Sequence, residues 1–301
     1  MQTLETPYMQ RTFLLALTIF AMNAKGQHID FKTKFETKFL TFDNYKVHCL
    51  KKGVGSPILL IHGGGTWMYS WRNIIDSLSL NHTVYACDMP GHGYTVAENE
   101  PKYELDDFAN FIDHFLTHFQ IDKISIVGNS WGGGWALYYA EKFPGKVEKL
   151  ILIDPSGLNV KDVFEWEILK YPLIGELASK MATKNAVKKA YQKVYVNQTL
   201  IDNSLINETY KPLKIRQNQR AAYKIKRNCK WTVTENKMSE VRIPVKIIWG
   251  DQDNYLEVKY AIIYASKIMT SDLTIMKNCG HTPHEEQPKE TLKIIEDFLT
   301  K

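Results

Sequence analysis

The sequence predicts an α/β fold, in which a mostly parallel sheet is flanked by helices and interrupted by a helical insertion. Short apolar runs alternate with segments of about 10–15 residues that have helical spacing, a rhythm typical of parallel sheets covered on both faces. The rhythm stops at about residue 157 and resumes with the apolar run IPVKIIWG at 243–250. These two observations predict one core with one insertion.

The first part of the core shows the alternation most clearly. FETKFLTFDNYKVHCLKKG (35–53) has the period of a hairpin at a sheet edge, and SPILLIHGGG (56–65) is continuously apolar, as in a strand buried on both faces. The elements expected after it are a helix at 71–79, a strand at 82–91, a helix at 106–119, a strand at 122–128, a helix at 133–143 and a strand at 147–157.

Residues 157–240 are helical in character, rich in lysine, tyrosine and asparagine, and contain no apolar strand. The alternation then continues with a strand at 243–250, a helix at 256–268, a strand at 271–278 and a final helix at 288–300. We therefore expect an α/β core formed by residues 27–156 and 241–301, with a helical insertion at 157–240.

The N-terminal residues have the pattern of a secretory signal peptide. Arg11 precedes the apolar run TFLLALTIFAM (12–22), small residues follow, and cleavage is expected before Gln27. A run of 11 residues is too short for a membrane span, which needs about 20. We expect a leader at 1–26 and a periplasmic or secreted protein without a stable membrane span; an N-terminal core helix is the alternative.

Composition and charge exclude several classes of protein. With 44% hydrophobic and 24% charged residues the chain is an ordinary globular protein. A net charge of +5, without a basic cluster interleaved with aromatic residues, does not indicate nucleic-acid binding. The four cysteines form no CxxC pair and no zinc-ligand spacing, so we expect buried thiols, with one disulfide left open, and neither a metal nor a cofactor. They are Cys49, Cys87, Cys229 and Cys279.

One pentapeptide, Gly128-Asn129-Ser130-Trp131-Gly132, places a serine at the corner between a predicted strand and a predicted helix. A serine on such a sharp turn needs very small neighbours two positions away on each side, and Gly128 and Gly132 provide that room. The free N–H groups at the start of the following helix favour developing negative charge. The motif therefore indicates a nucleophile, with a simple helix N-cap as the alternative for Ser130.

A serine hydroxyl becomes an effective nucleophile when a base takes its proton and an acid orients that base. Two later strands end in such residues, because WGDQD ends at Asp253 and NCGH ends at His281. The order Ser130, Asp253, His281 is the one expected for a triad at successive strand ends. HGGG (62–65) follows an earlier strand and can supply a second N–H group for an oxyanion.

In these motifs the chain resembles the α/β-hydrolase superfamily, from about residue 40 to 300 apart from the insertion. The resemblance implies that Ser130 is the nucleophile, His281 the base and Asp253 the acid. It also implies that the backbone N–H groups of Trp131 and Gly64, with Gly65 as a competitor, form the oxyanion hole, and that 157–240 is a helical cap that selects substrates. The matching motifs are HGGG (62–65), DMPGHG (88–93), GNSWGG (128–133), WGDQD (249–253) and CGH (279–281).

Other histidines and aspartates compete for the same roles. His284 lies three residues beyond His281 and is an alternative base. Asp154 is the main alternative acid, because some members of the superfamily place the acid after that earlier strand. The remaining candidates are expected to be structural: His62 and His92 bound by backbone groups, Asp88 bracing its turn and Asp251 capping one.

The resemblance extends to two subfamilies with different chemistry. Haloalkane dehalogenases and epoxide hydrolases share the motifs around HGGGTWMYSWRNI, but they have an aspartate where this chain has Ser130. Their alkyl-ester intermediate is cleaved by water, whereas a serine would form an ether that resists this cleavage, so that chemistry is excluded. The carbon–carbon bond hydrolases of aromatic ring-cleavage pathways do use serine and remain an alternative.

We therefore expect a serine hydrolase, similar to carboxylesterases, that cleaves a small-molecule ester or related acyl compound through an acyl-enzyme. A carbon–carbon bond hydrolase and a non-catalytic ligand-binding protein are the alternatives. The insertion contains 13 lysines, three arginines and eight acidic residues, a formal charge of +8. These charges either solvate outer helix faces or draw anionic substrates toward the pocket.

Overall fold

The computed structural model describes residues 31–161 and 163–301. The chain divides into two units, Met1–Lys34 and Phe35–Lys301. In the first unit the described element is α2 (Phe31–Lys34), so the predicted signal peptide lies outside the described residues. In the described part of the chain, no helix has both the length and the apolar character needed to span a bilayer.

The second unit contains a sheet of nine strands among its described residues, which confirms the predicted α/β class. The order is β1-β2-β4-β3-β6-β7-β8-β9, with β5 paired to β2. From β4 to β9 neighbouring strands are parallel, whereas β2 pairs antiparallel with β1, β4 and β5. The strands are β1 (Thr37–Phe42), β2 (Tyr45–Lys52), β3 (Ser56–Ile61), β4 (His82–Cys87), β5 (Val96–Ala97), β6 (Ile124–Asn129), β7 (Val147–Ile153), β8 (Val245–Gly250) and β9 (Ser271–Met276).

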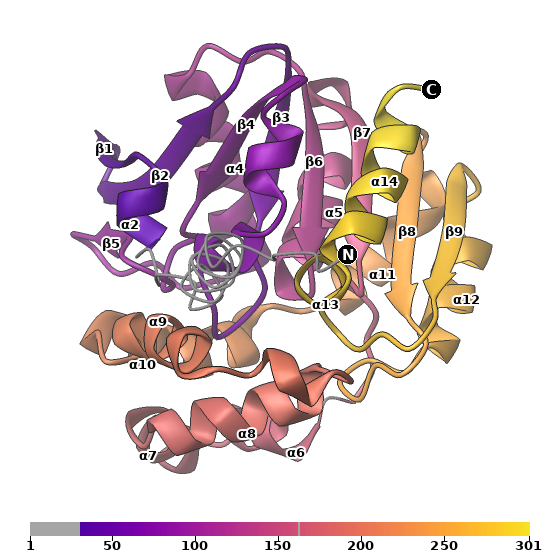
Figure 1. The fold of residues 1–301 in the computed structure, drawn as a ribbon. Helices are drawn as coiled ribbons and strands as arrows, with labels where there is room; N and C mark the ends of the chain where they lie inside the picture. The colour runs from indigo at the N-terminus through magenta and orange to yellow at the C-terminus, as the bar shows by residue number, and fades with distance from the viewer. Residues whose placement is uncertain (1–30, 162) are drawn as a thin grey trace, which may run out of the picture. The chain divides into compact units, whose positions relative to one another are not determined.

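Helices cover both faces of the sheet (Figure 1). On one face α3 (Ile75–Leu78) packs against α14 (Pro288–Leu299), which follows α13 (Pro283–Glu286). On the other face lie α4 (Leu105–His118), α5 (Trp131–Lys142) and α12 (Lys259–Lys267), whose buried residues join one hydrophobic cluster with alternate strand residues such as Leu59 and Leu150. Because helices cover both faces, β6 and β8 are buried along their whole length, whereas the edge strand β9 is not.

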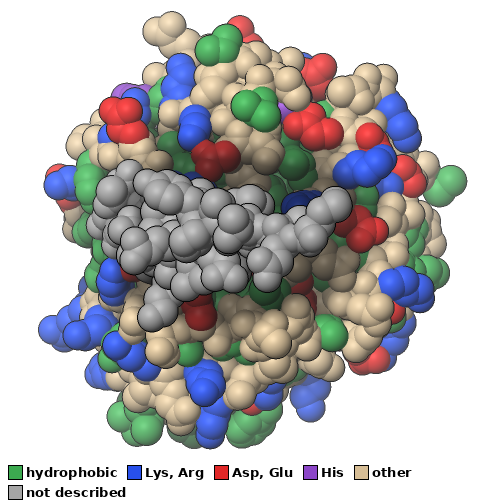
Figure 2. All heavy atoms as spheres, in the orientation of Figure 1, with side chains coloured by type: hydrophobic (Ala, Val, Ile, Leu, Met, Phe, Trp, Pro, Cys, Tyr) green, Lys and Arg blue, Asp and Glu red, His purple; other side chains and the backbone are tan. Residues whose placement is uncertain are grey.

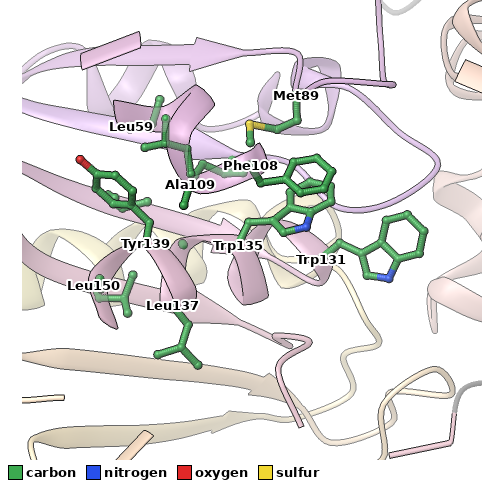
Figure 3. Packing of buried hydrophobic residues seen from close by; sticks show 14 of the residues in the cluster. Leu59, Met89, Phe108, Ala109, Trp131, Trp135, Leu137, Tyr139 and Leu150 are labelled. Atoms are coloured by element: carbon green, nitrogen blue, oxygen red, sulfur yellow. The ribbon is translucent and has the colours of Figure 1, made fainter. Parts of the chain in front are cut away.

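The helix α4 illustrates how the sequence specifies the core. Its buried residues recur at helical spacing, which gives the helix one apolar face. The backbone N–H of Glu104 donates to the Asp107 carboxylate at 2.9 Å, and this capping box fixes the first turn. Phe108 then stacks on Trp135 of α5 with ring centroids 4.1 Å apart, a contact drawn in Figure 3.

One expected helix differs from its prediction. The helix expected at 71–79 is divided into a 3-10 turn, η1 (Met68–Trp71), and α3. The reason is that the Met68 N–H donates to the Asp88 carboxylate at 3.0 Å, which fixes the start of the segment on the neighbouring loop. The helix α5 is followed by another 3-10 turn, η2 (Pro144–Lys146).

Between β7 and β8 the described residues form helices and turns without a strand. We call residues 157–240 the cap. Its contacting helices α7, α8, α9 and α10 lie together beyond one end of the sheet (Figure 1). Its elements are α6 (Phe164–Glu167), η3 (Ile168–Lys170), α7 (Ile174–Lys180), α8 (Lys184–Val194), η4 (Gln198–Leu200), α9 (Asn203–Leu213), α10 (Arg216–Asn228), α11 (Thr232–Lys237) and η5 (Met238–Glu240).

Buried contacts fasten the cap to the core. The Asn218 side chain donates to the Gly93 carbonyl at 2.8 Å, and the Trp67 indole donates to the Glu208 carbonyl at 3.0 Å. A cysteine adds one further contact, because the Cys229 thiol donates to the Tyr103 carbonyl at 3.4 Å. All four cysteines are free and buried. The disulfide that the sequence left open is therefore not formed.

Candidate active site

Ser130 lies at the sharp turn between β6 and α5. Its backbone has φ 53° and ψ −123°, a strained conformation for a residue other than glycine. A Cβ at Gly128 would lie 2.5 Å from the Gly132 carbonyl oxygen, and one at Gly132 would lie 2.3 Å from the Ile61 carbonyl oxygen. Both glycines are thus required by close backbone approach, as the motif predicted.

His281 and Asp253 are hydrogen-bonded to each other. Nδ1 of His281 and Oδ2 of Asp253 are 2.7 Å apart, and both side chains are buried. The other carboxylate oxygen, Oδ1, accepts from the N–H groups of Tyr255 at 2.6 Å and Leu256 at 3.0 Å. Because a carboxylate only accepts, Nδ1 carries the proton, and Nε2 is left as the basic atom of the imidazole.

The alternative acid, Asp154, is a close neighbour of this pair. One ligand atom from each of Asp154, Asp253 and His281 falls within a 4.8 Å group. The Asp154 Oδ1 accepts from the Gly250 N–H at 2.9 Å. Burial, followed by the adjacent Asp253, raises the pKa of the Asp154 carboxyl well above its usual range. The structure therefore brings both predicted acids together, but it shows the hydrogen bond to His281 only for Asp253.

The ligand atoms of these three side chains are also close enough together to hold a metal ion. Two of their ligand atoms already form hydrogen bonds within the protein, because Nδ1 of His281 bonds Asp253 and Oδ1 of Asp154 accepts from a backbone N–H. The three side chains therefore fit a hydrogen-bonded group that shares protons better than they fit a metal site.

The HGGG loop lies directly against the serine. A Cβ at Gly63 would lie 3.1 Å from the Ser130 Cβ, and one at Gly64 would lie 2.6 Å from the Trp131 ring. Trp131 is the first residue of α5, where a backbone N–H has no acceptor within the helix. The loop and the start of the helix thus bring backbone groups of the two predicted oxyanion-hole residues to the same place.

His62 holds this loop in position. Its Nε2 accepts from the Met89 N–H at 3.0 Å, so Nδ1 must carry the proton and donate to the Gly63 carbonyl at 2.8 Å. Burial lowers the pKa of the imidazole, which agrees with a neutral ring. His92 similarly bonds the Pro90 carbonyl at 3.2 Å, so both histidines are structural, as expected.

The remaining alternatives are also structural. His284 is fully buried with its ring centroid 4.2 Å from that of Trp71, and burial lowers its pKa well below the usual range. Asp88 braces its turn by accepting from the Tyr94 N–H at 2.8 Å and bonding His48 at 2.7 Å. Asp251 accepts from the Cys279 N–H at 3.3 Å, as a turn cap would.

Several residues at this site were not predicted from the sequence. Asn129 donates to the carbonyls of Ile153 at 3.0 Å and His281 at 3.1 Å, which ties the serine strand to the histidine loop. Tyr255 stacks on His281 with ring centroids 5.3 Å apart. Asn129 lies inside the serine motif and could have been noticed there, whereas Tyr255 gave no signal.

The cap also reaches the site. The Trp166 ring lies 4.8 Å from that of Trp131 and packs over Gly65. The His281 N–H donates to the Val194 carbonyl at 3.0 Å. Glu286 joins both parts, because its Oε1 accepts from the Gly280 N–H at 2.7 Å and its Oε2 from the Val196 N–H at 2.7 Å. These contacts join residues far apart in the chain and could not be seen in the sequence.

Comparisons with known proteins agree with this architecture. The family model described as alpha/beta hydrolase fold matches residues 56–288. Mouse monoacylglycerol lipase ABHD6 is 29% identical over 267 residues, which cover 83% of this chain and 77% of the mouse protein.

Solved structures of low sequence identity share the fold. A meta-cleavage product hydrolase from Pseudomonas fluorescens has a TM-score of 0.77 at 20% identity, covering 87% of this chain and 97% of its own. A putative lipase from Acinetobacter baumannii has a TM-score of 0.78 at 22% identity, covering 88% and 91%. The chain belongs to the alpha/beta hydrolase fold family and is a hydrolase.

Proposed function

We propose that the protein is a serine hydrolase that cleaves carboxylic esters through an acyl-enzyme, with Ser130, His281 and Asp253 as its triad. The observation that carries this proposal is the buried hydrogen bond between His281 and Asp253 at 2.7 Å, in the same site as a serine held at a strained turn. Strain of this kind persists where the surrounding structure imposes it, most often at functional sites.

Each step of the proposed reaction has a group to perform it. Nε2 of His281 takes the Ser130 proton as the hydroxyl oxygen attacks the ester carbonyl carbon, and then delivers it to the departing alcohol. Asp253 holds the imidazole by Nδ1 and stabilises the imidazolium. The same base then activates a water that cleaves the acyl-enzyme and restores the serine.

Backbone N–H groups of Gly64 and Trp131 stabilise the oxyanion of each tetrahedral intermediate. The tight approach of the HGGG loop to Ser130 and Trp131 supports this assignment. Such donors are effective because they are fixed before the charge develops, and losing one typically costs about 100- to 1,000-fold in kcat.

We propose a long-chain acyl ester of the monoacylglycerol type as the substrate class. The mouse relative is named as a monoacylglycerol lipase, and the alignment covers most of both chains. The aromatic side chains of Trp131, Trp166 and Tyr255 beside the triad would contact an apolar acyl chain.

We also propose that residues 1–26 direct export, supported by Arg11 and the apolar run that follows.

Labelling with a fluorophosphonate probe tests the nucleophile directly. We expect the probe to add once to the full chain, on Ser130, as read by intact mass and peptide mapping. Ser130→Ala should abolish labelling, whereas Ser156→Ala, a change at a neighbouring serine whose N–H bonds the Ser130 carbonyl at 2.9 Å, should retain it. Labelling that survives in folded Ser130→Ala protein would refute the proposal.

A panel of esters tests the substrate class. Monoacylglycerols of increasing chain length, a short-chain aryl ester and a vinylogous diketone acid of the ring-cleavage type are compared by kcat/KM. We expect the monoacylglycerols to be the best substrates. Preference for the diketone would replace ester hydrolysis by carbon–carbon bond hydrolysis on the same triad.

A further inference from the structure

Large apolar side chains are exposed along one short stretch of the cap. Six such residues fall within residues 164–181, and between 54% and 78% of each is exposed. Single exposed apolar residues are ordinary, whereas a contiguous group marks a surface that binds something. The six, which we call the apolar patch, are Phe164, Tyr171, Leu173, Ile174, Leu177 and Met181.

The helix α7 presents the patch on one side. Ile174, Leu177 and Met181 are spaced by three and four residues, so they lie on one helical face. The other side of α7 packs on η3 and α10. There Arg227 donates to the Tyr171 carbonyl at 2.9 Å and bonds the Glu176 carboxylate at 3.4 Å. The helix is therefore fastened to the cap with its apolar face outward.

Lysines surround the patch without matching acidic residues. Among the residues that the structure describes, four of the five exposed lysines on α7 and α8 form no ion pair, whereas the fifth, Lys193, pairs with Glu165. The nearby acidic residues Glu165, Glu167 and Glu176 are each paired with another cation. Figure 2 shows hydrophobic and basic side chains together at the lower margin, where Figure 1 places α7 and α8. The four lysines are Lys180, Lys184, Lys188 and Lys189.

We propose that the apolar patch and these lysines dock the protein on an anionic lipid surface. The apolar side chains would enter the boundary between headgroups and acyl chains, while the lysine ammonium groups contact lipid phosphates. This combination of an apolar face and a basic margin is what an interfacial helix requires.

Two other possible occupants of the apolar patch match the positive charge of the surrounding lysines less well. A second copy docking through the same patch would bring these lysines against their own equivalents, which repel. The apolar run at 12–22 of this chain is flanked by Arg11 and Lys25, so it would also add positive charge to a positive margin. An anionic lipid surface complements the apolar and the charged parts of this face together.

The patch is connected to the catalytic site through α6. Phe164 is exposed on this helix, whereas Trp166, two residues later, packs beside Trp131 and over Gly65. Docking would therefore place the segment that contacts the site at the lipid surface, where an acyl ester is found. This last step rests on the proposed function, but the docking itself does not.

Vesicle co-sedimentation tests the docking independently of catalysis. The full chain carrying Ser130→Ala is used, so that no lipid is cleaved, with vesicles of phosphatidylcholine alone or containing about one third phosphatidylglycerol. We expect binding to the anionic vesicles, weakened by salt, and much weaker binding to phosphatidylcholine alone. Equal binding to both, or none to either, would overturn the proposal.

Paired variants separate the two parts of the surface. Leu173→Asn with Leu177→Gln should weaken binding at least about tenfold, since apolar burial drives insertion. Asn tolerates the positive φ of 63° at Leu173, and Gln is a good helix former, so folding is kept. Lys188→Gln with Lys189→Gln should weaken binding by about 25-fold, at about fivefold per lysine.

Matched controls replace residues of the same types away from α7 and α8. Ile262→Gln with Met269→Gln removes exposed apolar side chains, and Lys123→Gln with Lys289→Gln removes exposed lysines. Equal losses in the control and patch variants would overturn the proposal. So would light scattering that shows a dimer lost in the patch variant without vesicle binding, because the patch would then serve a second copy.

Discussion

Two carboxyl groups, those of Asp253 and Asp154, lie beside the imidazole of His281, and their surroundings decide which one is ionised. Asp253 accepts from two backbone N–H groups and from His281, whereas Asp154 accepts from one backbone N–H. Donors stabilise the charged form, and a second buried charge at this distance is unfavourable. Asp253 therefore carries the charge and Asp154 the proton.

Asparagine substitutions distinguish the two acids. Asp253→Asn should lower kcat by about 1,000- to 10,000-fold, because an amide favours the wrong tautomer of His281. Asp154→Asn should keep kcat within about threefold, since an amide, like a neutral acid, both accepts from a backbone N–H and donates to Asp253. Ester hydrolysis by the two folded variants checks this, and the reverse ranking would make Asp154 the triad acid.

The raised pKa of Asp154 also predicts how stability changes with pH. Burial and the neighbouring Asp253 raise this pKa, and Glu286 acts in the same direction, while the Gly250 N–H opposes them. The folded state then binds the Asp154 proton more tightly than the unfolded state does. The contribution of Asp154 to the free energy of unfolding is therefore fully present below about pH 4, and it is lost as the pH rises through the folded pKa. The Tm of the Asp154→Asn variant minus the Tm of the unaltered protein should therefore increase as the pH is raised from 4 to 8. A constant difference in Tm across that range would mean that Asp154 is not neutral.

At the scale of elements, the histidine loop is positioned by the cap as well as by the core. Glu286 accepts from Gly280 on the loop and from Val196 and Asn197 in the cap, and the cap carbonyl of Val194 accepts from the His281 N–H. A single carboxylate thus joins two segments about 90 residues apart. The position of His281 depends on this junction.

Glu286→Gln should therefore lower kcat without removing the nucleophile. In the glutamine variant an NH2 group replaces one of the accepting carboxylate oxygens. The backbone N–H groups that donated to that oxygen lose their acceptor, and leaving such a group unsatisfied costs about 1–3 kcal/mol. We expect a loss of kcat on the order of 10- to 100-fold for short and long esters alike. Glu290→Gln, an exposed position on α14, is the control, and unchanged kcat in Glu286→Gln would show that the junction does not position His281.

The features that could be predicted from the sequence are those that depend on residues close together in the chain. The strands other than β5, and the helices α4, α5 and α14, were predicted because their periodicity is local. Ser130 was predicted because Gly128 and Gly132 lie only two positions from it in the chain. Glu286 and Trp166 gave no signal, since their roles depend on contacts between the cap and the core. Tyr255 gave none because its ring stacks on that of His281, which is distant in the chain. The division of the 71–79 helix follows from a contact within the core, the hydrogen bond from Met68 to Asp88.

At the scale of the whole molecule, charge is distributed unevenly. The cap has a formal charge of +8 against +5 for the chain, which leaves −3 for the remainder. A hollow of about 490 Å³ in the cap is lined by Lys170, Lys226, Arg227 and Lys230 among others. Positive charge is thus concentrated in the cap, which contacts the candidate site through Trp166 and Val194.

This distribution predicts different salt responses for charged and neutral substrates. An anionic ester should lose kcat/KM as salt increases from low concentration, because the field is screened beyond about 10 Å at 0.1 M. A neutral ester with the same acyl group should be unaffected. Equal responses of the two esters would mean that the lysines of the cap only solvate its surface.

Hydrolysis by Ser130→Ala, His281→Ala and the double variant tests the central claim most directly. If Ser130 and His281 act as one unit, each single change should remove several powers of ten from kcat, and the double change should cost little more than either alone. The folded state of each variant is confirmed by its thermal transition. Near-normal turnover by folded Ser130→Ala protein, or losses that add in the double variant, would contradict the mechanism.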